Sequence, residues 1–186
     1  INVSGTSSAT GTGSHGVSVT GSWTTGPSSG TSGTVTFANC QGGTGQASHG
    51  VNLGAAFTSS GNVIFTNCVG GNNGTTGGNG INASAAFTTA GTVTATTSIT
   101  GQGNGGVGFA SSANFSTTGA SHPIAITASA TGTTGACHGI SLTGGTMNSP
   151  SGAITLVGTS GASNASSFGI NLASAANSIT STSGAI

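Results

Sequence analysis

A short motif, in which glycine is followed by Val or Ile, then by any residue and then by an apolar residue, recurs six times along this chain. The copies begin at Gly16, Gly50, Gly80, Gly106, Gly139 and Gly169, so that successive glycines lie 34, 30, 26, 33 and 30 residues apart. Self-similarity at a period of about 20–50 residues is the signature of a repeat architecture, in which each period forms one structural unit. The chain is therefore expected to fold as a stack of similar units.

Two further apolar series run in phase with the first. One large apolar residue follows each motif, and these six residues are Trp23, Phe57, Phe87, Phe115, Met147 and Ile179. After a small turn comes an alternating segment, which begins at Val35, Val63, Val93, Ile124 and Ile154 in successive periods. Apolar residues that alternate with Ser, Thr or Asn are typical of half-buried strands. Each period thus predicts three short strands separated by turns.

Three short strands cannot bury an apolar face alone, but stacked units can bury a shared one. The sequence predicts a right-handed parallel β-solenoid of about six coils, as a single domain over residues 1–186, with coils about 4.8 Å apart. The six large residues of the second series should form one stacked core ladder. Both ends match the third strand, so we expect either a segment of a longer array or head-to-tail stacking of copies.

No Asp, Glu, Lys or Arg occurs among the 186 residues. Acid–base catalysis, hard-metal binding and phosphate binding use those side chains, and nucleic-acid binding depends on Lys and Arg. We therefore expect no catalytic residue, cofactor, metal or nucleic-acid partner, and no apolar run approaches the roughly 18 residues of a membrane span. Like charges stacked on neighbouring strands repel, whereas Thr, Ser and Asn pair with their copies.

Histidine recurs at one position, directly before the motif glycine, as His15, His49 and His138. His15 and His49 should stack in adjacent coils, which raises a two-histidine metal site as one interpretation. The other interpretation is a turn position that tolerates many residues, since Asn79, Gly105 and Phe168 also occupy it. Two imidazoles without a third ligand make a weak site, so no metal is predicted. With only four histidines to titrate, stability is expected to change little between about pH 8 and 4.

Cys40 and Cys68 occupy equivalent places after Asn39 and Asn67. Stacking in register brings their Cα atoms within the range of a disulfide, and a pair of buried thiols is the alternative. The two asparagines should begin a ladder of amide hydrogen bonds between coils.

The coils resemble the repetitive passenger regions of secreted bacterial surface proteins, which include filamentous-haemagglutinin-like adhesins and autotransporter passengers. The residues that carry this resemblance are segments 59–65 and 151–156, which look like the Thr-, Gly- and Asn-rich coils of those proteins. The resemblance implies a parallel β-helix that is exported to the cell surface.

The function expected from these features is a structural extracellular filament or stalk, or an adhesive surface protein, without catalytic activity. Its partners would be further copies of itself and, for an adhesin, a host surface or glycan. Net charge near zero favours such association. Two alternatives remain open at this point, an ice-binding solenoid and a non-catalytic carbohydrate-binding β-helix.

Overall fold

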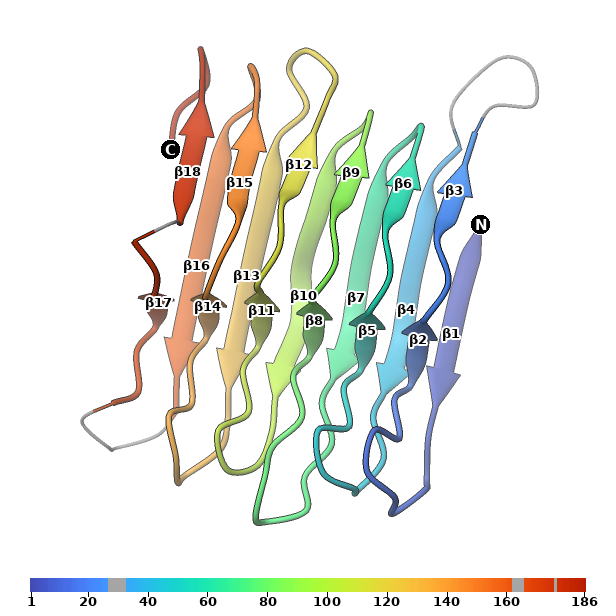
Figure 1. Ribbon diagram of the computed structural model, residues 1–186, viewed down its shortest axis with the longest axis vertical. Coiled ribbons are helices and arrows are strands. Elements are labelled where there is room, and N and C mark those ends of the chain that lie inside the picture. Colours follow the sequence, from blue (N-terminus) through green and yellow to red (C-terminus); the bar gives the residue numbers. More distant parts are fainter. Residues whose placement is uncertain (27–32, 162–165, 176) are drawn as a thin grey trace.

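The computed structural model describes residues 1–26, 33–161, 166–175 and 177–186, and every regular element in these ranges is a β-strand. The strands form three parallel sheets of six strands each (Figure 1). Sheet 1 contains β1 (Asn2–Thr6), β4 (Val35–Gln41), β7 (Val63–Val69), β10 (Val93–Gly101), β13 (Ile124–Ala130) and β16 (Ile154–Ser160). Sheet 2 contains β2 (Val17–Val19), β5 (Val51–Leu53), β8 (Ile81–Ala83), β11 (Phe109–Ser111), β14 (Ile140–Leu142) and β17 (Ile170–Leu172). Sheet 3 contains β3 (Trp23–Thr25), β6 (Phe57–Ser59), β9 (Phe87–Thr89), β12 (Phe115–Thr117), β15 (Thr146–Ser149) and β18 (Ser178–Ser181).

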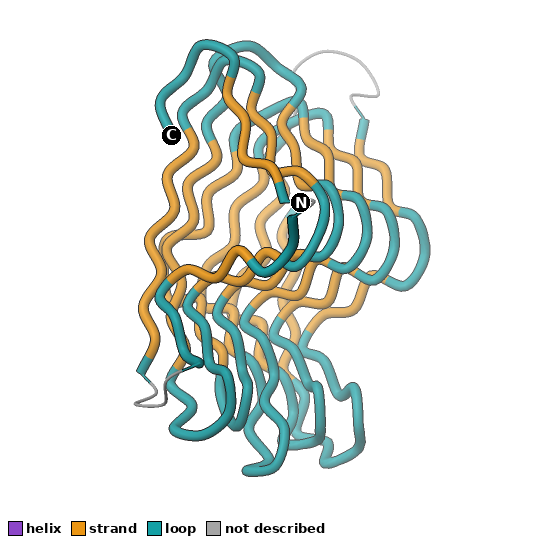
Figure 2. Tube along the Cα trace, turned by 60° about the vertical axis from the view of Figure 1, so that its left-hand side comes forward, coloured by secondary structure: helices purple, strands orange, loops and turns teal. Residues whose placement is uncertain are grey.

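The chain visits the three sheets in turn and adds one strand to each with every coil. Successive coils wind in the right-handed sense that parallel crossover connections favour (Figure 1). Figure 2 shows the coils stacked, with the loops that join sheet 1 to sheet 2 lying side by side along one edge. The predicted β-solenoid of about six coils of about 30 residues is confirmed.

The centre of the solenoid holds the core ladder that the spacing predicts. Trp23, Phe57, Phe87, Phe115, Met147 and Ile179 are successive register partners along sheet 3. The rings of Phe57 and Phe87 are stacked, with centroids 5.1 Å apart and planes at 5°, and those of Phe87 and Phe115 lie 4.2 Å apart at 8°. A second aromatic stack, Phe37 on Phe65 at 5.0 Å, reaches the same core from sheet 1.

The register of the fourth coil differs from the prediction. The sequence places the motif at Gly106-Val107, but in sheet 2 the pairing is Phe109 with Ile81 and Ile140, so Gly108 is the equivalent glycine. Both dipeptides fit the motif, because the segment repeats glycine and an apolar residue two positions apart. A shift of two residues keeps the same side chains facing inward, so periodicity alone does not distinguish the two registers.

Three strands of sheet 1, β4, β7 and β10, turn a corner and continue beyond it. Asn39, Asn67 and Ser98 have φ values of 54°, 51° and 52°, in the left-handed region that asparagine tolerates better than most residues. Beyond the corner Cys68 pairs with Cys40 on one side and with Ile99 on the other, and all three are fully buried. The sequence pattern missed this extra inward column because its residues are small or follow an irregular corner.

At the edge of sheet 2 the inward residues of β17 are open to solvent. Ile170 and Leu172 are 40% and 54% exposed, whereas their register partners Ile140 and Leu142 are buried. The burial of each coil therefore depends on the coils on both sides.

The core ladder gives a direct test of this packing. We expect Phe87→Ala to lower the free energy of unfolding by about 3–5 kcal/mol, because it leaves a cavity between two stacked rings. Thr58→Ala, on the outer face of the neighbouring strand, is the control and should change it by about 0.5 kcal/mol or less. Urea denaturation of the two variants measures the difference, and equal effects would place Phe87 outside the core.

Candidate functional site

The histidine position forms a hydrogen-bonded ladder between coils, which we call the acceptor ladder. Its members, one per coil, are His15, His49, Asn79, Val107, His138 and Phe168. The backbone N–H of His49 donates to His15 Nδ1 at 3.0 Å, and that of Asn79 donates to His49 Nδ1 at 2.9 Å. Val107 N–H donates to Asn79 Oδ1 at 3.1 Å, and Phe168 N–H to His138 Nδ1 at 3.2 Å. Each polar side chain thus accepts the backbone N–H of the next coil.

This bonding fixes the protonation state of the histidines. An Nδ1 that accepts a hydrogen bond carries no proton, so His15, His49 and His138 are neutral with the proton on Nε2. Burial lowers the pKa of His15 and of His138. For His49, burial and the neighbouring His15 lower the pKa to about 4.

The arrangement does not suit a metal ion. The rings of His15 and His49 are stacked, with centroids 4.9 Å apart and planes at 7°, so their in-plane lone pairs run parallel instead of meeting at one point. His15 Nδ1 and His49 Nδ1 are already used by the backbone. In the described part of the chain no three His, Cys, Asp or Glu side chains gather where they could share a metal ion. The second interpretation, a turn position that tolerates many residues, is incomplete as well. His and Asn at this position both accept a hydrogen bond from a backbone N–H of the next coil.

Cys40 and Cys68 are register partners, as the spacing predicts, but both are free, buried thiols. Side chains at paired positions of parallel strands point the same way, which does not give the dihedral angle a disulfide needs. The thiol hydrogen bond with Cys40, together with burial, raises the pKa of Cys68. The third cysteine, Cys137, is a buried thiol that contacts the carbonyl oxygens of Gly103 and Thr134. None of these three is placed as an activated nucleophile.

Asparagine side chains also join coils on the outer surface. At the corner of sheet 1, Asn67 Nδ2 donates to Asn39 Oδ1 at 3.0 Å, which is the ladder expected from the sequence. A second ladder on sheet 2, not anticipated, has Asn82 Nδ2 donating to Asn52 Oδ1 at 2.9 Å. The sequence does contain the pattern that predicts this second ladder, because Asn52 and Asn82 each lie two residues after the motif glycine.

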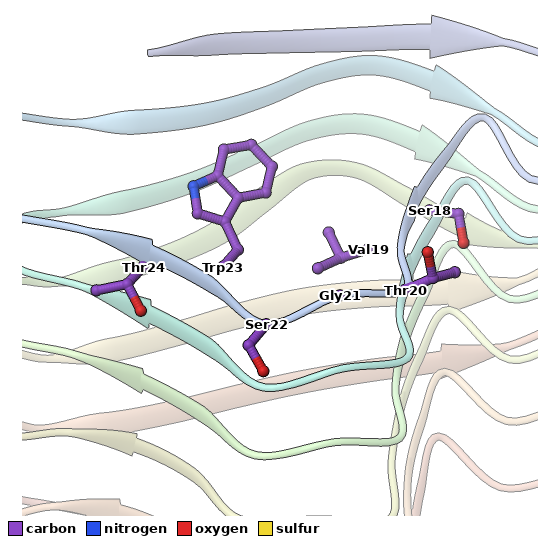
Figure 3. Close-up of a pocket in the computed structure, with 7 residues that line it drawn as sticks. All are labelled: Ser18, Val19, Thr20, Gly21, Ser22, Trp23 and Thr24. Carbon is purple, nitrogen blue, oxygen red and sulfur yellow. The ribbon is translucent and has the colours of Figure 1, made fainter.

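A hollow of about 470 Å³ lies where the first coil turns from β2 to β3, and residues 18–24 line it. Figure 3 shows Val19 and Trp23 pointing toward sheet 1, while Ser22 and Thr24 point away. All its lining residues come from one coil, and no imidazole, thiol or carboxamide is among them. The hollow therefore offers hydroxyl groups and one indole, without a group suited to acid–base or nucleophilic chemistry.

Comparisons with protein-family models, curated proteins and solved structures find no match to this chain. Among the residues that the structure describes, no helix has the length and apolar character needed to cross a membrane.

The acceptor ladder predicts that stability depends on pH, whereas the sequence alone predicts little change between about pH 8 and 4. The folded pKa of His49 lies below its ordinary value of 6.5, so above pH 6.5 it is neutral in both the folded and unfolded states. Between pH 6.5 and about 4 the unfolded chain binds a proton that the folded chain does not. We therefore expect the free energy of unfolding to fall by roughly 3 kcal/mol as the pH drops through this range, because each pH unit costs about 1.4 kcal/mol.

Urea denaturation at a series of pH values measures this loss, and His49→Asn provides a matched control. Asparagine keeps a side-chain acceptor, as Asn79 does naturally, but does not titrate. The variant should be folded at pH 7 and should lose much less stability on acidification. A wild-type profile that stays flat from pH 7 to 4 would contradict the assignment of a neutral His49.

Proposed function

We propose that this chain is a segment of an extracellular structural rod, either a stalk or a filament, which acts through stiffness and self-association and not through catalysis. The observation that carries this proposal is the use of its polar side chains. His15, His49, Asn67 and Asn82, which elsewhere could serve chemistry, bond one coil to the next. A structure whose functional groups join its own repeats is suited to a mechanical role.

Association of copies is supported by charge and by the sheet edges. The chain has no fixed side-chain charge, so no long-range repulsion keeps copies apart. Among the residues that the structure describes, the two outermost strands of each sheet, for example β1 and β16 in sheet 1, have a partner on one side only. Such strands present unpaired N–H and C=O groups that can pair with a further strand. End-to-end contact would continue all three sheets along the rod.

The extracellular location rests on the resemblance to passenger regions of bacterial surface proteins, whose coils project from the cell. The absence of catalytic function rests on composition, since the carboxylates and cationic groups that glycan-cleaving β-helices would need do not occur in this sequence.

Electron microscopy and fibre diffraction of the purified protein test this proposal. We expect rods or fibres with an axial layer spacing of about 4.8 Å, since coils stack at the strand spacing. Sedimentation velocity over a range of concentrations gives the matching solution measurement. A compact monomer that persists at high concentration would overturn the filament proposal.

Ice binding is a second candidate, favoured by the outer face of sheet 3. Its central outward column is almost entirely hydroxylated, and its members are Thr24, Thr58, Thr88, Ser116, Asn148 and Thr180, paired in register. The corresponding column of sheet 1 is mixed, with Ile64 and Ala125 among threonines. Hydroxyls repeated about every 4.8 Å along the stack of strands lie near an oxygen spacing of hexagonal ice.

A thermal-hysteresis assay separates this candidate from a purely structural role. If sheet 3 binds ice, Thr58→Tyr should abolish hysteresis because a bulky ring interrupts the flat column. Thr36→Tyr on sheet 1 should leave it intact. No hysteresis from the unmodified protein would exclude ice binding.

A further inference from the structure

A polar cleft lies among three neighbouring loops that join sheet 1 to sheet 2. Its volume is about 310 Å³, and its side chains come from Asn72, Gln102, Asn104 and the segment 131–134, with glycine backbone between them. The loops belong to successive coils, namely residues 70–80, 102–108 and 131–139. The volume falls at the lower end of the range of about 300–1,000 Å³ that is usual for ligand sites.

Backbone hydrogen bonds between the loops fix the shape of this cleft. Gly78 and Gln102 exchange two backbone bonds, of 3.1 and 3.0 Å. Gly105 N–H donates to the Thr134 carbonyl at 3.1 Å, which joins the second loop to the third. Within the first loop, Asn72 Oδ1 accepts the N–H of Gly74 at 3.0 Å. The lining is therefore held in place before any ligand arrives, which lowers the entropic cost of binding.

Two carboxamides of this cleft, those of Gln102 and Asn104, differ from the carboxamides that join coils elsewhere. Asn67 and Asn82 bond to copies of themselves in the preceding coil. In contrast, within the described part of the chain no hydrogen-bond partner is found for the carboxamides of Gln102 and Asn104, both half-buried, or for the exposed hydroxyl of Thr133. These groups give donors and acceptors on one concave surface without contributing to the stack.

The chemistry of the lining selects the class of ligand. Amides and hydroxyls offer donors and acceptors but no net charge, and the cleft includes no aromatic or large aliphatic side chain. Phosphates, carboxylates and metal cations would lose hydration without a compensating opposite charge, and apolar ligands would bury little surface. An uncharged molecule rich in hydroxyl and amide groups can exchange its bonds to water for bonds to the protein.

We propose that this cleft binds one end of a neutral saccharide, which would make the rod adhesive as well as structural. The biological role of this site rests on the proposed extracellular function, but saccharide binding itself does not require that the protein form filaments. Because hydrogen bonds exchanged with water contribute only about 0.5–1.5 kcal/mol each, binding in the millimolar range is expected.

Saturation-transfer NMR with three disaccharides tests the proposal. The neutral probes are diacetylchitobiose, whose acetamido groups match carboxamides, and maltose, and the charged probe is digalacturonate. We expect transfer to at least one neutral probe and none to digalacturonate. The double variant Gln102→Ala, Asn104→Ala should weaken that binding tenfold or more, whereas Gln46→Ala, an exposed carboxamide on another loop, should not change it.

Each remaining outcome overturns the proposal. Absence of transfer to both neutral probes removes the saccharide site, and binding that the double variant leaves unchanged places it elsewhere. Equal binding of digalacturonate contradicts selection by neutral chemistry. Circular dichroism of the variants checks that they are folded, and electron microscopy of the same samples shows whether rod formation succeeds or fails independently.

Discussion

In-register stacking of coils is the constraint on which the rest of this structure depends. Each strand pairs with its copy in the next coil, so Phe57 lies on Phe87 and Asn39 lies beside Asn67. Residues that bond or pack well with themselves are stabilised by this arrangement, whereas a stacked charge would face an equal charge about 4.8 Å away. The stacked aromatic rings inside the solenoid and the hydrogen-bonded carboxamides outside it both arise because each coil repeats the one before it. On the strands, the lack of charge is thus a consequence of the fold.

Much of the fold could be predicted because stacked coils require similar residues at equivalent positions, so the sequence repeats once per coil. Large residues such as Phe87 and Met147 recur once per coil, and alternation around Val63 shows which side chains face inward. Two features escaped that pattern. The fourth coil offers Val107 and Phe109 as equally good starts for a strand, and only pairing with both neighbours decides between them. The corner residues have irregular conformations that alternation does not describe.

The acceptor ladder shows what sequence comparison between coils can and cannot give. Aligning the coils puts His49 and Asn79 at one position, and the variety of residues there looked like tolerance. Their shared property is an acceptor at a similar distance from the backbone, Nδ1 in one and Oδ1 in the other. The role of this acceptor is recognised only when the structure shows that the backbone N–H of the next coil lies beside it. Val107 has no such acceptor and interrupts the ladder, so the coils are not bonded equally along the solenoid.

The surface of a solenoid can select a ligand at one particular place only where the residues of a coil differ from those of its neighbours. Along the outer face of sheet 3 the strand residues nearly repeat, as Thr24, Thr58 and Thr88 do, so that surface varies little from coil to coil. The loops between sheets 1 and 2 differ in length and composition from coil to coil, and there Gln102 and Asn104 are not paired with copies of themselves. A chain without charged residues can still recognise a ligand at such a place, but only through neutral hydrogen bonds. The same composition that permits stacking therefore limits the partners that the loops can select.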